Sequence, residues 1–176
     1  RIGSAVALRM KSFGMNIGFY DPHKESGIEK TLGILRFENI EEIIKFSTII
    51  SINCTLNRET KGMINSKFIN NLNKNTILVN TARGEIVEKL DVLFNGLKSN
   101  RLGGVGLDVL PHEPPKKQEK LIKAWKNVNN PFNSKIIINP HAAYFSSRSV
   151  REMKIKAAEN MKRHLKGLKL KNIINN

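Results

Sequence analysis

Four short runs of consecutive apolar residues constrain the fold of this chain most strongly. They read "TIISIN" at 48–53, "TILVN" at 76–80, "GGVGLDV" at 103–109 and "KIIIN" at 135–139. Runs of this length, rich in β-branched residues, are typical of strands buried in a parallel sheet. The segments between them have helical patterns, which predicts right-handed crossovers and helices on both faces of the sheet. The fold class is therefore α/β, a doubly wound parallel sheet.

The remaining elements follow from the same patterns. Residues 16–20 and, more weakly, 34–37 are expected to form two further strands. Residues 4–13 are expected to form a helix with Ala5, Val6 and Leu8 facing inward. Further helices are expected at 38–46, 66–71, 90–99, 120–126 and 146–166.

Composition limits the class of protein. A chain of 176 residues, 40% hydrophobic and 26% charged, suits one globular domain. No apolar run approaches the roughly 20 residues that a transmembrane helix needs, and nothing resembles a signal peptide. The single cysteine, Cys54, excludes an internal disulfide and a zinc-ligand cluster. These observations predict a cytoplasmic protein without a membrane partner or a bound metal.

The charge balance raises a nucleic-acid hypothesis. The chain has 30 basic and 15 acidic residues, a formal charge of +15, and such a surplus can neutralise phosphates. However, the basic residues are spread over helical stretches such as "KKQEKLIKAWK", and aromatic residues make up only 6%. We therefore favour solvated helix faces and a general compositional bias over a nucleic-acid partner.

Asp21 is the first candidate site residue, because ligands of such sheets bind at the carboxyl ends of the strands. It follows the strand expected at 16–20, in "FYDP". A carboxylate there can accept hydrogen bonds from both ribose hydroxyls of adenosine and repels a 2′-phosphate, which favours NAD over NADP. The alternative is a turn-forming Asp before Pro22. The spacing from Gly3 suits a glycine fingerprint followed by a helix and a strand, and favours the cofactor role.

Arg83, Glu113 and His141 also follow predicted strands. An arginine suits bidentate binding of a carboxylate, and a histidine exchanges a proton near neutral pH. A glutamate beside the histidine would orient the imidazole and favour its protonated form. Each residue alone is more often structural, but the three together indicate catalysis. Cys54 is assigned no chemistry of its own.

Several motifs resemble a known family. "NTARGEIVE", "GVGLDVLPHEPP" and "NPHAAYFS" resemble the signature blocks of the D-isomer-specific 2-hydroxyacid dehydrogenases. "FYDPHKESGIEKTLGI" and "INCTLN" resemble the branch that includes the C-terminal-binding proteins, which are NAD-dependent transcriptional corepressors. The resemblance extends over nearly the whole chain.

The resemblance implies a Rossmann-type NAD-binding domain over residues 1–146. In the family a Gly-x-Gly precedes Arg1, so that Gly3 is the last glycine of G-x-G-x-x-G. The chain is then expected to be a fragment that lacks its first strand, at the centre of the sheet, and an N-terminal substrate domain. Residues 147–176 would form a C-terminal helix and tail that return to that domain.

The resemblance also implies roles for single residues. Arg83 would bind the substrate carboxylate and polarise the keto group, His141 would be the general acid and base, and Glu113 its carboxylate partner. Tyr144 would lie near the substrate, together with Arg83 and His141. The implied cofactor-binding set is Arg1, Ile2, Gly3, Asp21, Cys54, Thr55, Leu56, Asn57, Thr60, Thr81, Ala82, Arg83, Asp108, His141 and Tyr144.

The implied function is reversible hydride transfer between NAD(H) and a 2-keto or 2-hydroxy acid. The alternative is an NAD-responsive corepressor or scaffold protein of the C-terminal-binding-protein type, which keeps the same cofactor residues. Family members usually dimerise through this domain, so a homodimer is expected. The fragment by itself is expected to be poorly stable and nearly inactive.

Overall fold

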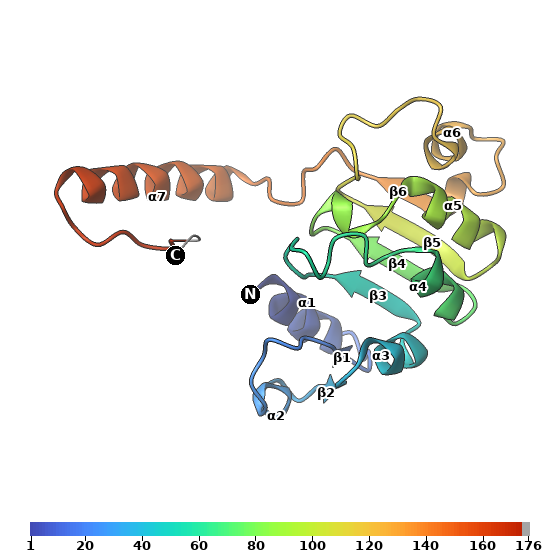
Figure 1. The fold of residues 1–176 in the computed structure, drawn as a ribbon, viewed down its shortest axis with the longest axis horizontal. Coiled ribbons are helices and arrows are strands. Elements are labelled where there is room, and N and C mark those ends of the chain that lie inside the picture. The colour runs from blue at the N-terminus through green and yellow to red at the C-terminus, as the bar shows by residue number, and fades with distance from the viewer. Residues whose placement is uncertain (174–176) are drawn as a thin grey trace. The chain divides into compact units, whose positions relative to one another are not determined.

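The computed structural model describes residues 1–173 and divides the chain into two compact units. The first unit comprises residues 1–141, and the second begins at Ala142 (Figure 1). The first unit contains both sheets of the structure, and the second contains the long helix α7. We describe the two units separately.

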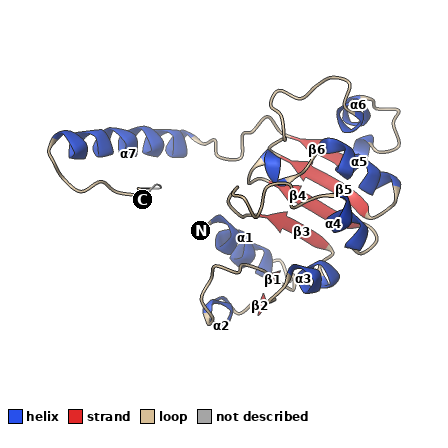
Figure 2. Ribbon diagram, viewed as in Figure 1, coloured by secondary structure: helices blue, strands red, loops and turns tan. Residues whose placement is uncertain are grey.

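The first unit is built on a four-stranded parallel sheet in the order β3-β4-β5-β6 (Figure 2). The strands are β3 (Ile49–Ile52), β4 (Thr76–Asn80), β5 (Leu102–Leu107) and β6 (Ile136–Ile138). The connections contain α4 (Ser66–Asn71), α5 (Leu90–Lys98) and α6 (Lys120–Lys126), with short 3-10 helices at Gly84–Ile86 and Asn133–Lys135. The four apolar runs therefore form the predicted parallel strands.

One face of this sheet carries the hydrophobic core. Leu78 of β4, Val105 of β5 and Ile136 of β6 point to this face and are buried. Helix α5 packs against β5, α4 and α6, and it buries Leu93 and Leu97 completely. Burial of a side chain of this size stabilises the fold by about 1.5–3 kcal/mol.

The opposite face of the sheet is largely open. The side chains of a strand alternate between the two faces, so Ile77 of β4 points away from Leu78. Ile49 is its register partner on β3. Ile77 is 42% exposed, and Ile137 of β6, on the same face, is 64% exposed. The cover expected on this face is thus missing over Ile77 and Ile137 in the part of the chain that the structure describes.

A second, two-stranded parallel sheet pairs β1 (Gly18–Phe19) with β2 (Leu35–Arg36). It is accompanied by α1 (Ile2–Lys11), α2 (Ile28–Leu32) and α3 (Ile40–Phe46), of which α2 was not predicted. The doubly wound α/β class is confirmed, but its strands form two sheets, since β1 and β3 are not hydrogen-bonded to each other. Leu8 was predicted to face inward and is 48% exposed, because no described element covers that side of α1.

The second unit consists mainly of α7 (Ser147–Leu165). Ser146 caps its first turn: its hydroxyl accepts the Ser149 N–H, and the Ser149 hydroxyl in turn accepts the Ser146 N–H. The helix is amphipathic, yet none of its residues is buried. Within residues 1–173, no helix combines the length and the apolar character needed to cross a membrane.

Candidate active site

The predicted site residues of the first unit follow the strands at their carboxyl ends. Asp21 comes after β1 and Cys54 after β3. Arg83, Asp108 and His141 come after β4, β5 and β6. Carboxyl ends of neighbouring parallel strands meet at one edge of a sheet, which is where ligands of this fold class bind.

Glu113 and His141 form the clearest pair at this edge. Glu113 Oε2 lies 2.8 Å from His141 Nδ1, although 28 residues separate the two in the chain. Burial alone would raise the pKa of Glu113, but the His141 hydrogen bond and the Leu110 N–H outweigh it, so the pKa is lowered. An ionised carboxylate only accepts hydrogen bonds, so Nδ1 of His141 carries the proton.

The backbone of His141 has an unusual conformation. Its φ is +53°, in the left-handed region that residues with a Cβ seldom adopt. Such conformations are costly and are concentrated at functional sites. The His141 side chain is 45% exposed, so the ring is both held by Glu113 and open to solvent.

Arg83 lies in an exposed turn directly after β4. Its Nη1 donates to the Ala82 carbonyl oxygen at 2.7 Å. The next residue, Gly84, is buried against the loop that carries Glu113, since an added Cβ would lie 1.9 Å from the Leu110 oxygen. Only glycine allows this contact, through which the turn that carries Arg83 packs against the loop that carries Glu113.

Asp21 follows β1 and Cys54 follows β3, and the two are near enough to interact electrostatically. Burial, together with the negative charge of Asp21, raises the pKa of the Cys54 thiol. The Cys54 thiol therefore stays protonated at neutral pH, which agrees with assigning it no chemistry. Asp21 Oδ1 accepts the His23 N–H at 3.0 Å, and Oδ2 accepts no hydrogen bond from the described residues.

The loop after Cys54 is shaped by its own polar side chains. The Thr60 hydroxyl donates to the Thr55 carbonyl oxygen at 2.6 Å, and Asn57 Oδ1 accepts the N–H groups of Glu59 and Thr60. An ion pair joins this loop to the Asp21 loop, with His23 Nε2 3.2 Å from Glu59 Oε2. Nothing in the sequence indicated that pair, whose members are 36 residues apart.

The start of α1 adjoins the same place. A Cβ added at Gly3 would lie 3.2 Å from Asn53 Cβ, at the end of β3. Arg1 is the N-cap of α1, and both Arg1 and Ile2 are exposed. A helix N-terminus favours a pyrophosphate, and Asp21 suits a ribose. The residues at this end therefore fit the pyrophosphate and the adenosine ribose of a dinucleotide such as NAD.

Two further predicted cofactor residues, Thr81 and Asp108, differ in exposure. Thr81 is exposed in the turn after β4. Asp108 is 4% exposed and donates its N–H to the Asn80 carbonyl oxygen. Tyr144 belongs to the second unit, so the structure does not place it in this site.

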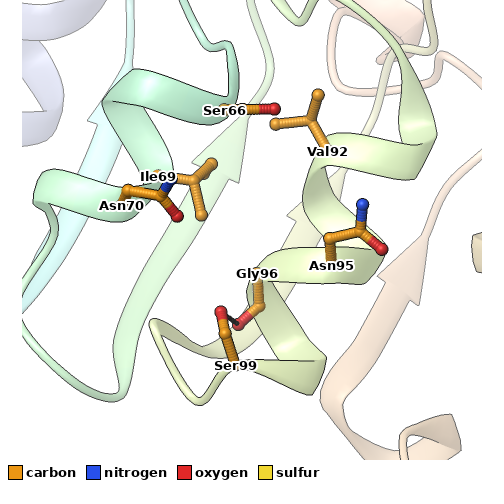
Figure 3. Close-up of a pocket in the computed structure, with 7 residues that line it drawn as sticks. All are labelled: Ser66, Ile69, Asn70, Val92, Asn95, Gly96 and Ser99. Atoms are coloured by element: carbon orange, nitrogen blue, oxygen red, sulfur yellow. Dashed lines mark hydrogen bonds between the residues drawn. The ribbon is translucent and has the colours of Figure 1, made fainter.

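A surface cavity of about 140 Å³ lies between α4 and α5, away from the strand ends (Figure 3). Ser66, Asn70, Asn95 and Ser99 give it a polar lining, and the Ser99 hydroxyl donates to the Gly96 oxygen. None of its lining residues is titratable. It therefore offers no acid or base for catalysis.

Sequence reasoning missed Asn80, the last residue of β4. Its side chain is completely buried and hydrogen-bonded to the backbone of the Arg83 turn. The available signal was a polar residue ending an apolar run just before the predicted catalytic arginine.

Comparison with known proteins shows which family and relatives the chain is similar to. Residues 1–143 match the family model described as "D-isomer specific 2-hydroxyacid dehydrogenase, NAD binding domain". The chain is 33% identical to a glyoxylate reductase of Korarchaeum cryptofilum over 99% of its length, and 31% identical to C-terminal-binding protein 1 of Caenorhabditis elegans over 95%. It spans 49% of the first relative and 22% of the second.

Solved structures of dehydrogenases and reductases have a similar fold. The structure matches D-lactate dehydrogenase with NAD+ from Lactobacillus jensenii with a TM-score of 0.80 at 27% identity. That match covers 99% of this chain and 53% of the dehydrogenase. A glyoxylate reductase from Paecilomyes thermophila matches with a TM-score of 0.78 at 28% identity, over 92% of this chain and 45% of that one.

Proposed function

The chain belongs to the D-isomer-specific 2-hydroxyacid dehydrogenases, whose NAD-binding domain it carries, and on that premise we propose that the protein interconverts a 2-keto acid and a 2-hydroxy acid. The observation that carries this proposal is the contact between Glu113 and His141, 2.8 Å apart at the carboxyl edge of the sheet. It supplies a general acid whose protonated form is supported by a carboxylate.

Each residue has a distinct task in this proposal. Arg83 binds the substrate carboxylate and brings the carbonyl carbon to the cofactor, which is the positioning contribution to the rate. His141 donates its Nε2 proton to the carbonyl oxygen, while Nδ1 stays bonded to Glu113. Bound NADH supplies the hydride to the carbonyl carbon. Asp108 would hold the nicotinamide carboxamide, and Tyr144 would lie near the substrate.

The test is NADH oxidation by the full-length protein that contains these residues. Glyoxylate, hydroxypyruvate, phosphohydroxypyruvate and larger keto acids form the panel, because the site does not distinguish among them. Rapid turnover on one of them supports the enzyme and identifies its substrate class. Tight NADH binding with negligible turnover across the panel supports the alternative, an NAD-responsive scaffold. The 31% identity to C-terminal-binding protein 1 is the observation that favours this alternative.

Asp21 is expected to determine the choice of cofactor. In Asp21→Asn, the side chain keeps its shape but loses the charge that repels a 2′-phosphate. We expect the ratio of NADPH to NADH affinity to rise by about 10-fold or more, since juxtaposed like charges cost several kcal/mol. Fluorescence titration with both cofactors measures this ratio. An unchanged ratio would contradict the ribose-binding role of Asp21.

Residues 1–176 alone are expected to bind NADH at least about 10-fold more weakly than the full-length protein. The two halves of the proposed cofactor cleft lie on sheets that share no hydrogen bonds, and a two-stranded sheet such as β1–β2 is marginally stable. Circular dichroism melts and NADH titration test this expectation. A sharp cooperative melt with tight NADH binding would contradict it.

The remaining proposals rest on the family resemblance and on composition. Residues 1–146 would form the NAD-binding domain, and residues 147–176, of which 174–176 lie outside the described residues, would pack on a substrate domain. The exposed apolar residues of α7, among them Met161 and Leu165, support such a contact. The protein would be a cytoplasmic homodimer joined through the NAD-binding domain.

A further inference from the structure

Asn80 ends β4 at the carboxyl edge of the sheet, and its side chain is 0% exposed. Its carbonyl oxygen accepts the Asp108 N–H, so its backbone also belongs to the ladder between β4 and β5. A buried amide is expensive unless its donors and acceptors are paired. The partners of this side chain therefore show what the chain gains from an asparagine here.

Both partners lie in the turn that carries Arg83. Asn80 Oδ1 accepts the Ala82 N–H at 3.0 Å, and Asn80 Nδ2 donates to the Arg83 carbonyl oxygen at 2.9 Å. The amide thus holds the backbone on both sides of the Ala82–Arg83 peptide bond. A carboxylate in its place could accept the Ala82 N–H, but it could not donate to the Arg83 carbonyl oxygen, because it has no N–H.

The same turn is joined to the other catalytic residues. Gly84 lies against the Leu110 carbonyl, and the Leu110 N–H donates to Glu113 Oε1 at 2.8 Å. Glu113 in turn holds His141. The Arg83 side chain is exposed and, among residues 1–173, makes one hydrogen bond, to its own neighbour Ala82. Its location relative to His141 therefore depends on how firmly its backbone is held.

We propose that Asn80 is a positioning residue, whose side-chain amide fixes the Arg83 turn and so places the guanidinium for the substrate carboxylate. This inference rests on the proposed function, in which Arg83 binds that carboxylate. A misplacement of about 1 Å can cost about 10²-fold in rate.

The experiment is a double-mutant cycle in the full-length protein, with Asn80→Asp, Arg83→Ala and the double variant. We expect Asn80→Asp to lower kcat/KM by about 10- to 100-fold, mainly through KM for the keto acid. In the Arg83→Ala background the same change should cost less than about twofold, because no guanidinium remains to be placed. Single-turnover NADH oxidation with excess enzyme makes the slow variants measurable.

Asn73→Asp is the matched control. The Asn73 amide donates to the Lys45 carbonyl at 2.7 Å, at the opposite end of the sheet. The control should lower the melting temperature without changing KM. Asn80→Ser, which can replace only one of the two hydrogen bonds, provides the same readouts if Asn80→Asp does not fold.

Exchange of the Ala82 amide hydrogen separates this inference from the proposed function. It should be faster in Asn80→Ala, which removes the acceptor of this N–H, whether or not the protein reduces any keto acid. Equal losses of kcat/KM from Asn80→Asp with and without Arg83, or an unchanged KM, would overturn the positioning role. Absence of turnover in the unsubstituted protein would instead overturn the proposed function.

Discussion

Replacing His141 with alanine is expected to lower kcat for keto-acid reduction by about 10²–10⁴-fold, the usual contribution of a general acid. The imidazole is the only group in the proposed mechanism that donates a proton to the carbonyl oxygen. The NADH Kd should change much less than kcat, because most of the implied cofactor-binding residues, among them Asp21 and the loop after β3, stay in place. Steady-state kinetics and fluorescence titration measure the two effects, and near-normal turnover in His141→Ala would refute the assignment.

Glu113→Gln is the companion variant, which keeps the shape of the side chain and removes its charge. The pKa of Glu113 lies below its ordinary value of 4.5, so the carboxylate is ionised at neutral pH and the pair is lost only in acid. Without that charge the protonated imidazole is less favoured. Reduction at neutral pH should therefore be slower in Glu113→Gln than in the unsubstituted protein. An unchanged rate at neutral pH would show that the charge of Glu113 does not contribute.

Arg83→Ala is expected to weaken transition-state binding by about 2–5 kcal/mol. This loss lowers kcat/KM for the keto acid by about 30- to 4,000-fold. The substrate carboxylate would lose its charged partner, and the carbonyl carbon its position. Arg83→Lys should recover part of the loss, since it restores the charge but not the bidentate geometry. Kinetics over a range of keto-acid concentrations measure both variants.

Arg101→Ala is the control for Arg83. Arg101 also donates through Nη1 to a carbonyl oxygen, that of Leu72, but it precedes β5 at the far end of the sheet. Its loss should reduce stability and leave kcat/KM nearly unchanged. Equal kinetic losses in Arg83→Ala and Arg101→Ala would mean that Arg83 acts through stability rather than through the substrate.

Most secondary structure was predictable because it depends on local patterns. The bounds expected for α4, β4 and α6 match the structure. The helix α2 was missed because its five residues, "IEKTL", are too few to show helical periodicity. The run at 48–53 indicated a buried strand, but β3 lies at the edge of its sheet and Ile49 is exposed.

The sequence by itself determined the α/β class, the order of the strands along the chain and the residue types at each strand end. These three features follow from hydrophobic periodicity and short motifs, which depend only on residues close together in the chain. Only the tertiary structure decided that the strands form two sheets and that Ile77 is exposed. The pairing of Glu113 with His141 was expected from the family resemblance, and the structure places the two side chains 2.8 Å apart. Burial and pairing depend on what lies opposite a residue in space, and no local pattern records that. Asn80 shows the same division. The sequence shows that an asparagine ends β4, but only the tertiary structure shows that its side chain is hydrogen-bonded to the backbone of Ala82 and Arg83.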